Sequence, residues 1–333
     1  MTSVQYDVLG IGNAIVDVIA QTEEDFLVKH GMQKGAMTLI DEARAAAIYE
    51  AMGPTIESSG GSAANTIVGI ASFGARGAFV GKVKKDALGD VFIHDIRAAG
   101  VAFETRSATD GPSTARCYVL ITPDGERTMN TYLGAAQNLH PHDIDPNMIA
   151  QAGITYLEGY LWDPQDAKEA FVKAAAAAHK AGRQVALTLS DAFCVDRYRN
   201  EFLDLMRKGT VDIVFANESE LKSLYQTADF HAAIAQLRND AKLAVVTRSE
   251  HGCVVVTSTN VTPVPAFPIE RLVDTTGAGD LFAAGFLVGL ARGADHTTCG
   301  KFGALAAAEV IQHVGARPQQ SLKALAASSG LRV

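Results

Sequence analysis

The sequence DTTGAGD occupies residues 274–280, and the apolar run LFAAGFL follows directly at residues 281–287. Small residues that end a loop and apolar residues that open a run predict a helix beginning near Ala278. The first backbone N–H groups of a helix have no internal partner and carry the positive end of the helix dipole. A Gly-Ala-Gly turn lets an anion such as a phosphate approach those donors without meeting side chains.

Asp280 falls in the first turn of this expected helix, beside the place that an anion would occupy. Backbone donors next to a carboxylate suit phosphoryl transfer to a hydroxyl group, because the donors stabilise the transferred group and the carboxylate accepts the proton. A structural interpretation is also open, since Asp is favoured in a first helical turn and glycines commonly precede helices.

A regular alternation of apolar runs and helical stretches fills the second half of the chain. Strands are expected at 154–157, 184–189, 213–216, 243–247, 252–257 and 261–264, and helices at 166–181, 201–208, 218–225, 230–239, 278–292 and 297–312. This alternation predicts an α/β fold with a mostly parallel sheet and helices on both faces. Ligands in such folds bind at the carboxyl ends of strands, which groups Asn13, Gly60-Gly61, Asn217, Thr247 and Asp280.

Bulk composition narrows the class of protein. The chain has 333 residues, 48% hydrophobic and 20% charged, which fits one large domain or one domain with a smaller appendage. A net charge of −8 argues against nucleic-acid and anionic-membrane partners. The four cysteines form no C-x-x-C pair, the start lacks a signal-peptide pattern, and the longest apolar stretches are too short to span a bilayer. We therefore expect a cytoplasmic location.

The N-terminal sequence YDVLGIG, residues 6–12, predicts a buried strand, and residues 15–20 predict more strand. The pattern Gly10-x-Gly12-x-x-Ile15 lacks the third glycine of a dinucleotide-binding turn, which disfavours a dehydrogenase. Asn13 and Asp17 interrupt these runs. They are either turn residues or side chains that bind sugar hydroxyl groups, since Asp accepts two hydrogen bonds at once.

A glycine pair follows the helix expected at 42–52. Gly60 and Gly61 permit close backbone approach and hinge-like dihedral angles. Ser62 is expected to cap a helix that extends through Phe73, with Asn65 in its first turn. Asn is a mediocre helix former, so Asn65 either points at a ligand hydroxyl group or lies on the surface.

A further strand is expected at 77–83. Its end, Gly81-Lys82-Val83, resembles part of a P-loop, but Arg76 and Val83 replace the required glycine and Ser/Thr. A Walker-type nucleotide site is therefore not supported.

After a helix at 88–99, residues 101–137 lose the helical rhythm and contain β-type runs and a Pro-Asp-Gly turn at 123–125. This segment predicts a β-rich insert. Its simplest form is a surface hairpin on which Arg127 is a solvated charge.

Asn217 and Glu220 follow the strand at 213–216. Asn at an N-cap with Glu three residues later is a capping-box pattern that needs no ligand. The functional alternative is a carboxylate that orders the waters of Mg²⁺, which keeps several waters and takes few protein ligands. The spacing favours the cap, and both functions are compatible.

Together these motifs resemble the ribokinase family, also called the PfkB carbohydrate kinases, from about residue 6 to about residue 318. The resemblance rests on Gly60-Gly61-x-x-x-Asn65, on Asn217-x-x-Glu220 and above all on residues 274–280. Members of the family transfer the γ-phosphoryl group of ATP to a hydroxymethyl group of a sugar or nucleoside. The resemblance implies a ribokinase-like fold with two parts. A large α/β part would comprise 1–12, 42–100 and 138–333, and a small β-sheet lid 13–41 and 101–137.

The resemblance also implies roles at the reaction centre. Asp280 would be the catalytic base for the acceptor hydroxyl group, and Asn65 would contact sugar hydroxyl groups. The anion hole would consist of the N–H groups of Gly277, Ala278 and Gly279. The lid hinge would be Gly60-Gly61, and lid closure would exclude water from the phosphoryl group.

On the nucleotide side, the resemblance implies that Glu220 organises Mg²⁺ through water and that Asn217 lies near the phosphates. Thr247 and Gly252 fall where the family holds ATP. His313 is either part of the adenine wall or a half-exposed histidine at a helix end. The implied cofactors are ATP and Mg²⁺, and the sequence leaves a monovalent cation such as K⁺ open.

The opening Gly12-Asn13-x-x-x-Asp17 is closer to the adenosine kinase branch than to ribokinase proper. In that branch the Asp binds the ribose 2′ and 3′ hydroxyl groups, and Arg127 falls where a lid arginine reaches the active site. Tyr160 falls near the aromatic residue that stacks on the base, although ordinary core packing also explains it. No dedicated site for a phosphorylated sugar is evident.

The leading hypothesis is a nucleoside kinase that prefers adenosine. The second is a kinase of a free sugar, ribose or a hexose, with the same machinery. The third is a non-catalytic ligand-binding protein on a kinase fold, which the intact Asp280 and glycine turn disfavour. The sequence leaves monomer and homodimer open.

Overall fold

The computed structural model describes residues 3–331. Within them, nine strands form a large sheet whose pairings are parallel, except that the strand Cys253–Thr257 pairs antiparallel with both of its neighbours. In spatial order they are β14 (Val261–Val264), β13 (Cys253–Thr257), β12 (Leu243–Thr247), β11 (Ile213–Asn217), β10 (Gln184–Thr188), β9 (Ala152–Glu158), β1 (Tyr6–Ile11), β5 (Gly77–Val80) and β6 (Ala102–Phe103). The predicted α/β fold with a mostly parallel sheet is confirmed.

Helices cover both faces of the large sheet. One face packs against α3 (Ser62–Ser72), α4 (Ala87–Ala98), α10 (Ala278–Ala291), α11 (His296–Val310) and α12 (Leu322–Ser328). The other packs against α5 (Pro146–Ala150), α6 (Gln165–Lys180), α7 (Ala192–Arg207), α8 (Glu218–Leu224) and α9 (Phe230–Asp240). Successive residues of β1 show the cause: Val8 packs into the first layer and Leu9 into the second, because side chains alternate across a strand.

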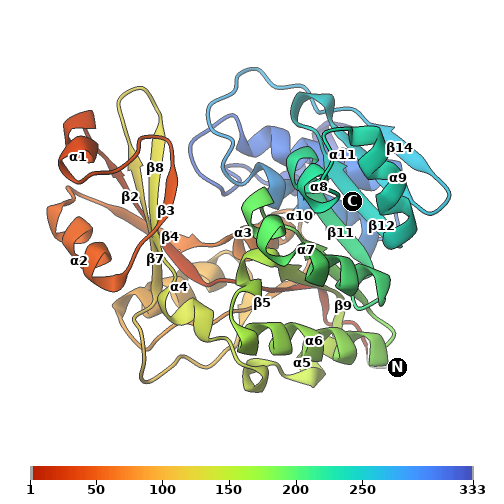
Figure 1. The fold of residues 1–333 in the computed structure, drawn as a ribbon, viewed down its shortest axis with the longest axis horizontal. Coiled ribbons are helices and arrows are strands. Elements are labelled where there is room, and N and C mark those ends of the chain that lie inside the picture. The colour runs from red at the N-terminus through yellow and green to blue at the C-terminus, as the bar shows by residue number, and fades with distance from the viewer. Residues whose placement is uncertain (1–2, 332–333) are drawn as a thin grey trace.

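A separate five-stranded sheet stands beside this body, with α1 (Glu24–Lys29) and α2 (Glu42–Ala51) on its far side (Figure 1). Its strand order is β3 (Met37–Leu39), β8 (Arg127–Tyr132), β7 (Ala115–Ile121), β2 (Ile15–Gln21) and β4 (Ile56–Gly60). We call this sheet the lid sheet.

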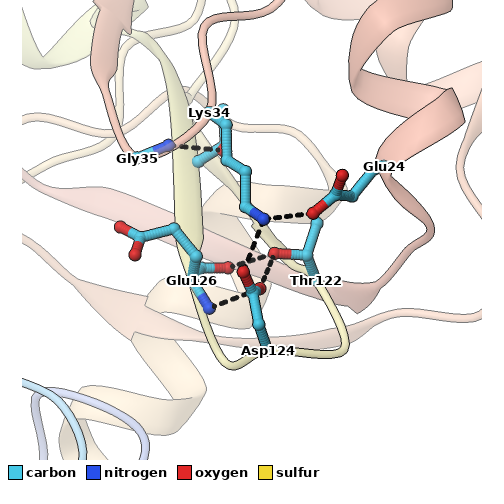
Figure 2. Close-up of polar contacts among 7 residues, drawn as sticks. Glu24, Lys34, Gly35, Thr122, Asp124 and Glu126 are labelled. Atoms are coloured by element: carbon cyan, nitrogen blue, oxygen red, sulfur yellow. Dashed lines mark hydrogen bonds and ion pairs between the residues drawn. The ribbon is translucent and has the colours of Figure 1, made fainter.

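An ion-pair cluster holds the end of the lid sheet (Figure 2). The Lys34 ammonium group lies between Glu24 of α1 and Asp124 of the β7–β8 turn. Asp124 also accepts hydrogen bonds from the Thr122 hydroxyl group at 2.6 Å and the Glu126 N–H at 3.2 Å. The turn is therefore fastened to α1 directly before Arg127, the first residue of β8.

The sheets correct two of the expected boundaries. β4, Ile56–Gly60, pairs with β2 in the lid sheet, although residues 42–100 were expected to belong wholly to the large part. β6, Ala102–Phe103, pairs with β5 in the large sheet, although residues 101–137 were expected in the lid. The sequence of β4 is IESSG, which lacks an apolar alternation, and Ile56 is 71% exposed, so hydrophobic pattern could not identify the strand.

Other expected elements differ in extent. β5 ends at Val80 rather than at 83, and Lys82 instead forms an ion pair with Asp143 at 2.6 Å. The helix expected at 201–208 begins earlier, at Ala192, with non-helical dihedral angles at Tyr198. The prediction missed α1, β3, β4, α5 and α12, all of seven residues or fewer. No helix in residues 3–331 combines the length and the apolar character needed to cross a membrane.

Close packing of α3 against α10 brings their two N-termini together. A side chain at Gly69 of α3 would place its Cβ atom 2.7 Å from Leu281 and Ala284 of α10, so glycine allows this approach. Both helices begin near the carboxyl ends of the parallel strands, where the residues of interest meet.

Candidate active site

Gly277 begins α10 from the left-handed region, with φ 77° and ψ 0°. A Cβ atom there would lie 2.8 Å from both Cα and Cβ of Ala316, so both the dihedral angle and the space demand glycine. The Leu281 N–H makes the first helical bond, to the Gly277 carbonyl oxygen at 2.8 Å. The sequence thus predicted this helix start correctly.

The three amides expected to form an anion hole differ in their surroundings. The Ala278 N–H donates to the Thr275 carbonyl oxygen at 3.2 Å. Gly279 is exposed and its N–H has no hydrogen-bond partner within residues 3–331. The Gly279 N–H is therefore the donor of this turn that is most open to an anion.

Asp280 is half-buried and is held by two donors from α3. The Ser62 hydroxyl group donates to Oδ1 at 2.6 Å, and the Asn65 amide donates to Oδ2 at 3.2 Å. Burial raises the pKa of Asp280, and the Ser62 and Asn65 hydrogen bonds and the Arg317 charge oppose that rise. The predicted cap at Ser62 is wrong: Gly61 is the N-cap residue, so Ser62 already lies in the helix with its hydroxyl group turned to Asp280.

Asp274 ties the lid sheet to the loop before α10. Its carboxylate accepts hydrogen bonds from the Thr276 N–H at 3.0 Å and the Gly315 N–H at 2.9 Å. It also pairs with the Arg127 guanidinium group at 3.0 Å, and both side chains are only 9% exposed. Nε and Nη2 of Arg127 are buried without a hydrogen-bond partner among the described residues. Arg127 is thus no solvated surface charge, because it reaches from the lid sheet into the DTTGAGD loop.

The glycine pair lies where β4 meets the β1–β2 connection. Gly61 has φ 97°, and a Cβ atom there would lie 2.2 Å from the Asn13 carbonyl oxygen. At Gly60 a Cβ atom would lie 2.3 Å from Oδ2 of Asp17. Burial raises the pKa of Asp17 to about 6, against the opposing charges of Arg317 and Arg127. Asp17 therefore belongs to the same charged group as Asp280.

Asn13 is buried and is oriented by a residue to which the sequence analysis gave no role. Its Nδ2 donates to Oε1 of Glu158 at 2.7 Å, while its Oδ1 has no hydrogen-bond partner among residues 3–331. Oε2 of Glu158 accepts from the Ala63 N–H at 2.8 Å, in the first turn of α3. Burial raises the pKa of Glu158 to about 7. The available signal was a Glu that ends the apolar strand β9.

Tyr160 lies in the short 3₁₀ helix η3 (Gly159–Trp162) and is half-buried. Its N–H donates to the Ser190 hydroxyl group at 3.0 Å, and its hydroxyl group donates to the Ser190 carbonyl oxygen at 3.2 Å. Burial raises its pKa, and the negative charges of Asp191 and Asp280 raise it further. The ring is thus held close to the acidic centre.

Asn217 and Thr247 are register partners at the ends of β11 and β12, so the structure brings these two predicted residues together. The capping box is confirmed: the Asn217 side chain accepts from the Glu220 N–H at 2.8 Å, and Glu220 accepts from the Asn217 N–H at 3.0 Å. Burial raises the pKa of Glu220 to about 7, and nearby Asp191 adds to this. Asp191, the N-cap of α7, was not singled out from sequence.

Gly252 and His313 have clear structural functions. Gly252 has φ 77°, and a Cβ atom there would lie 2.1 Å from the Val264 carbonyl oxygen. His313 lies 3.2 Å from the Glu309 carboxylate, and their side chains are 14% and 2% exposed. His313 is therefore a packed residue next to the C-terminal loop, and its expected place in an adenine wall stays a prediction.

The carboxyl groups of Glu220 and Asp191 are the candidates for binding the water molecules of a metal ion. Residues 3–331 contain no group of three or more His, Cys, Asp or Glu side chains placed to hold a metal ion. The charge of Asp191 raises the pKa of Glu220, so the two carboxyl groups are neighbours, and a carboxylate has lone pairs beyond those used in a cap. This donor set fits a hydrated Mg²⁺ and does not fit a fully protein-ligated ion.

Comparison with known proteins gives a consistent result. The chain is 54% identical to the adenosine kinase from Sinorhizobium meliloti, with a TM-score of 0.91 over 98% of this chain and 99% of that one. It is 52% identical to a probable sugar kinase protein from Rhizobium etli CFN 42, with a TM-score of 0.92 and the same coverage. It is also 29% identical to the adenosine kinase of Saccharomyces cerevisiae over 327 residues, which are 92% of this chain and 94% of that protein.

Residues 52–323 match the family described as pfkB family carbohydrate kinase, and this range contains the glycine pair, the capping box and the DTTGAGD loop. The fold and the relatives agree with the resemblance that the motifs suggested. The chain therefore belongs to the pfkB family of carbohydrate kinases and is a phosphotransferase of the adenosine kinase-like type.

Proposed function

We propose that this enzyme transfers the γ-phosphoryl group of ATP to the 5′-hydroxyl group of a nucleoside, adenosine preferred, giving AMP and ADP. One observation carries the proposal: a half-buried carboxylate, Asp280, is held by Ser62 and Asn65 one residue after the open Gly279 amide. A proton acceptor thus lies next to an N–H group that can donate a hydrogen bond to an anion, as phosphoryl transfer to a hydroxyl group requires.

In the proposed reaction Asp280 accepts the proton of the acceptor hydroxyl group as that oxygen attacks the phosphoryl group. The start of α10 stabilises the charge on the transferred group through the Gly279 N–H and the helix dipole. The Nε and Nη2 atoms of Arg127, buried and without a hydrogen-bond partner in residues 3–331, give a second source of positive charge from the lid sheet. When bound, Mg²⁺ would neutralise charge on the ATP phosphates, with Glu220 and Asp191 holding its waters.

Binding of the acceptor sugar is proposed at Asp17, Asn13 and Asn65, with Gly60-Gly61 as hinge. The buried Oδ1 of Asn13 has no hydrogen-bond partner among the described residues, so a sugar hydroxyl group that donates to it would satisfy an unpaired acceptor. Tyr160 is the proposed stacking surface for the base, and Asn217, Thr247, Gly252 and His313 line the proposed nucleotide side. Support for adenosine comes from the two adenosine kinases that the chain resembles.

The second candidate is a free sugar as acceptor, favoured by the similarity to the probable sugar kinase from Rhizobium etli. Both candidates use Asp280, and they differ in the need for an aromatic base platform at Tyr160. We would measure ATP consumption with Mg²⁺, with and without K⁺, against adenosine, inosine, guanosine, cytidine, ribose, fructose and fructose 6-phosphate. Phosphorus NMR would locate the phosphate on the product.

A strong preference for adenosine with phosphate on the 5′ oxygen is the expected result. A preference for ribose or fructose would keep the proposed functions of Asp280 and Gly279 and would remove Tyr160 from the site. ATP consumption with none of the seven acceptors would contradict the proposal.

A further inference from the structure

Arg317 lies in the loop between α11 and α12 and reaches into the candidate active site. Its Nε–H donates to Oδ1 of Asn65 at 2.8 Å. Its Nη2 donates to the carbonyl oxygen of Ser59 at 2.6 Å and to the Ser59 hydroxyl oxygen at 3.1 Å. One guanidinium group therefore contacts helix α3 and strand β4, directly before the Gly60-Gly61 pair.

The contact with Asn65 decides which way its amide points. Arg nitrogens can only donate hydrogen bonds, so the Asn65 atom that faces Arg317 must be the carbonyl oxygen. The amide nitrogen of Asn65 is then directed to Oδ2 of Asp280 at 3.2 Å, where an ionised carboxylate can only accept. Both ends of the Asn65 side chain thus agree with a single orientation, and Asn65 is 6% exposed.

The contact with Ser59 ties the same group to the lid sheet. Ser59 is 1% exposed and belongs to β4, one residue before Gly60. Its N–H and hydroxyl group both donate to Oδ2 of Asp95 on α4, at 2.8 and 2.5 Å. The hydroxyl oxygen is left to accept from Arg317, which completes a continuous chain of hydrogen bonds from Asp95 to Asp280.

We infer that Arg317 is a positioning residue for the phosphoryl transfer, which holds the Asn65 amide against Asp280 and fixes that pair to the strand before the hinge. The inference rests on the proposed function for its effect on rate. Its structural content, the orientation of Asn65 and the charge beside Asp280, is independent of which acceptor is used.

Charge reinforces the geometry. The charge of Asp280 acts on five other ionisable groups: Asp17 from β2, Tyr156 and Glu158 from β9, Tyr160 from η3 and Arg317 from the C-terminal loop. Arg317 is the cation in this set, and it lowers the pKa of both Asp280 and Asp17. Removal of its charge should therefore raise the pKa of Asp280, and the base should lose its proton only at higher pH.

The test compares Arg317→Gln, Arg317→Lys and the control Arg97→Gln. Arg97 also donates two hydrogen bonds to a backbone carbonyl group, that of Phe103, and is not among the charges that act on Asp280. We expect Arg317→Gln to lower kcat about 10- to 100-fold, the loss of a hydrogen bond near a charged group, and to move the acidic limb of the kcat–pH profile to higher pH. Arg317→Lys should leave the acidic limb of the kcat–pH profile in place, because the charge is kept, and should lower kcat less than Arg317→Gln does. Arg97→Gln should leave kcat and the limb unchanged.

A second readout separates this inference from the proposed function. Carbon-13 NMR of the Asp carboxyl groups, with Asp280 assigned from Asp280→Asn, reports the titration of Asp280 without any substrate. Its midpoint should rise in Arg317→Gln and stay in place in Arg97→Gln, even if adenosine proves to be the wrong acceptor.

An unchanged Asp280 midpoint in folded Arg317→Gln would overturn the inference, as would unchanged kcat in both Arg317 variants. If Arg317→Gln does not fold, Arg317→Lys decides: unchanged kcat and KM relative to the unaltered enzyme would show that the fork of the guanidinium group has no positioning function.

Discussion

The N-termini of α3 and α10 are built alike and lie side by side. At the start of α3, however, a carboxylate of the protein already accepts a hydrogen bond from a free N–H group. Each helix follows a glycine with positive φ, Gly61 at 97° and Gly277 at 77°, and neither N-cap residue supplies a side-chain hydrogen bond. In each, the fourth residue makes the first helical bond: Asn65 to Gly61 at 2.9 Å, and Leu281 to Gly277 at 2.8 Å.

The second residue of each helix shows the difference. In α3 the Ala63 N–H donates to the buried carboxylate of Glu158 at 2.8 Å. In α10 the equivalent residue is Gly279, whose N–H has no partner in the described chain. A Cβ atom added at Gly279 would have no described atom within 4 Å. A helix N-terminus is therefore open to a ligand only where the fold does not provide its own carboxylate.

Two polar side chains in the first turn of α3 point toward α10. Ser62 and Asn65 both donate to Asp280, so the filled helix end positions the carboxylate of the open one. The difference between the two helix ends leads to three predictions.

The largest effect is expected for Asp280→Asn. If the open helix end is the reaction centre, turnover should fall by about 10²- to 10⁴-fold, the range for a positioned proton acceptor. Thermal stability should stay the same or rise, because burial disfavours the charged carboxylate. Steady-state kinetics and thermal denaturation measure the two effects, and Asp295→Asn, at the N-cap of α11, is a control that should leave turnover unchanged. Near-normal turnover in Asp280→Asn would remove the reaction centre from α10.

Sequence alone could predict the open helix end but not the filled one. The signals at 274–280 are local: small residues, an acid in the first turn and an apolar run. The contacts that fill α3 join residues far apart in the chain, 95 positions between Ala63 and Glu158 and 252 between Asn65 and Arg317. No local pattern marks such pairs, because they depend on which strand end faces which helix.

The same distinction applies to the rest of the fold. The strands of the large sheet are apolar runs, and their alternation with helices predicts a mostly parallel sheet. β4 was missed because its pairing with β2 in the lid sheet, not its own composition, makes it a strand. The Asn217 capping box was predicted because both of its members lie within one turn.

An intermediate effect is expected for Glu158→Gln and concerns stability. Burial raises the pKa of Glu158 from 4.5 to about 7, so between these values the folded protein keeps a proton that the unfolded chain releases. The wild type should therefore lose stability as pH rises through this window, and a non-titrating Gln should not. The difference in unfolding free energy, variant minus wild type, should grow by on the order of 3 kcal/mol between pH 5 and pH 8.

Chemical denaturation at the two pH values measures this growth. Glu218→Gln is the matched control, because Lys222 and Arg248 lower the pKa of Glu218 and its titration lies below the window. Its difference from wild type should be the same at pH 5 and pH 8. If the difference in unfolding free energy for Glu158→Gln is also the same at pH 5 and pH 8, the fold does not raise the pKa of the carboxyl group at the start of α3.

The smallest effect is expected for Gly279→Ala, which places a methyl group at the open amide of α10. Nothing lies within 4 Å of the new Cβ atom and φ at this position is not positive, so the fold should tolerate the change. A methyl group where the phosphate approaches should weaken the interaction by about tenfold in kcat/KM for ATP, or about 1.4 kcal/mol. Steady-state kinetics at varied ATP, with thermal denaturation alongside, measures both quantities.

Gly277→Ala gives the contrast that interprets this result. Its Cβ atom would lie 2.8 Å from Ala316 and its φ is 77°, so it should lower stability by about 2 kcal/mol, which Gly279→Ala should not. If Gly279→Ala loses activity while it keeps its stability, the methyl group acts on the bound anion rather than on the helix. If Gly279→Ala retains full kcat/KM for ATP, the open amide does not contact the phosphate, and the two helix ends would differ in structure without differing in function.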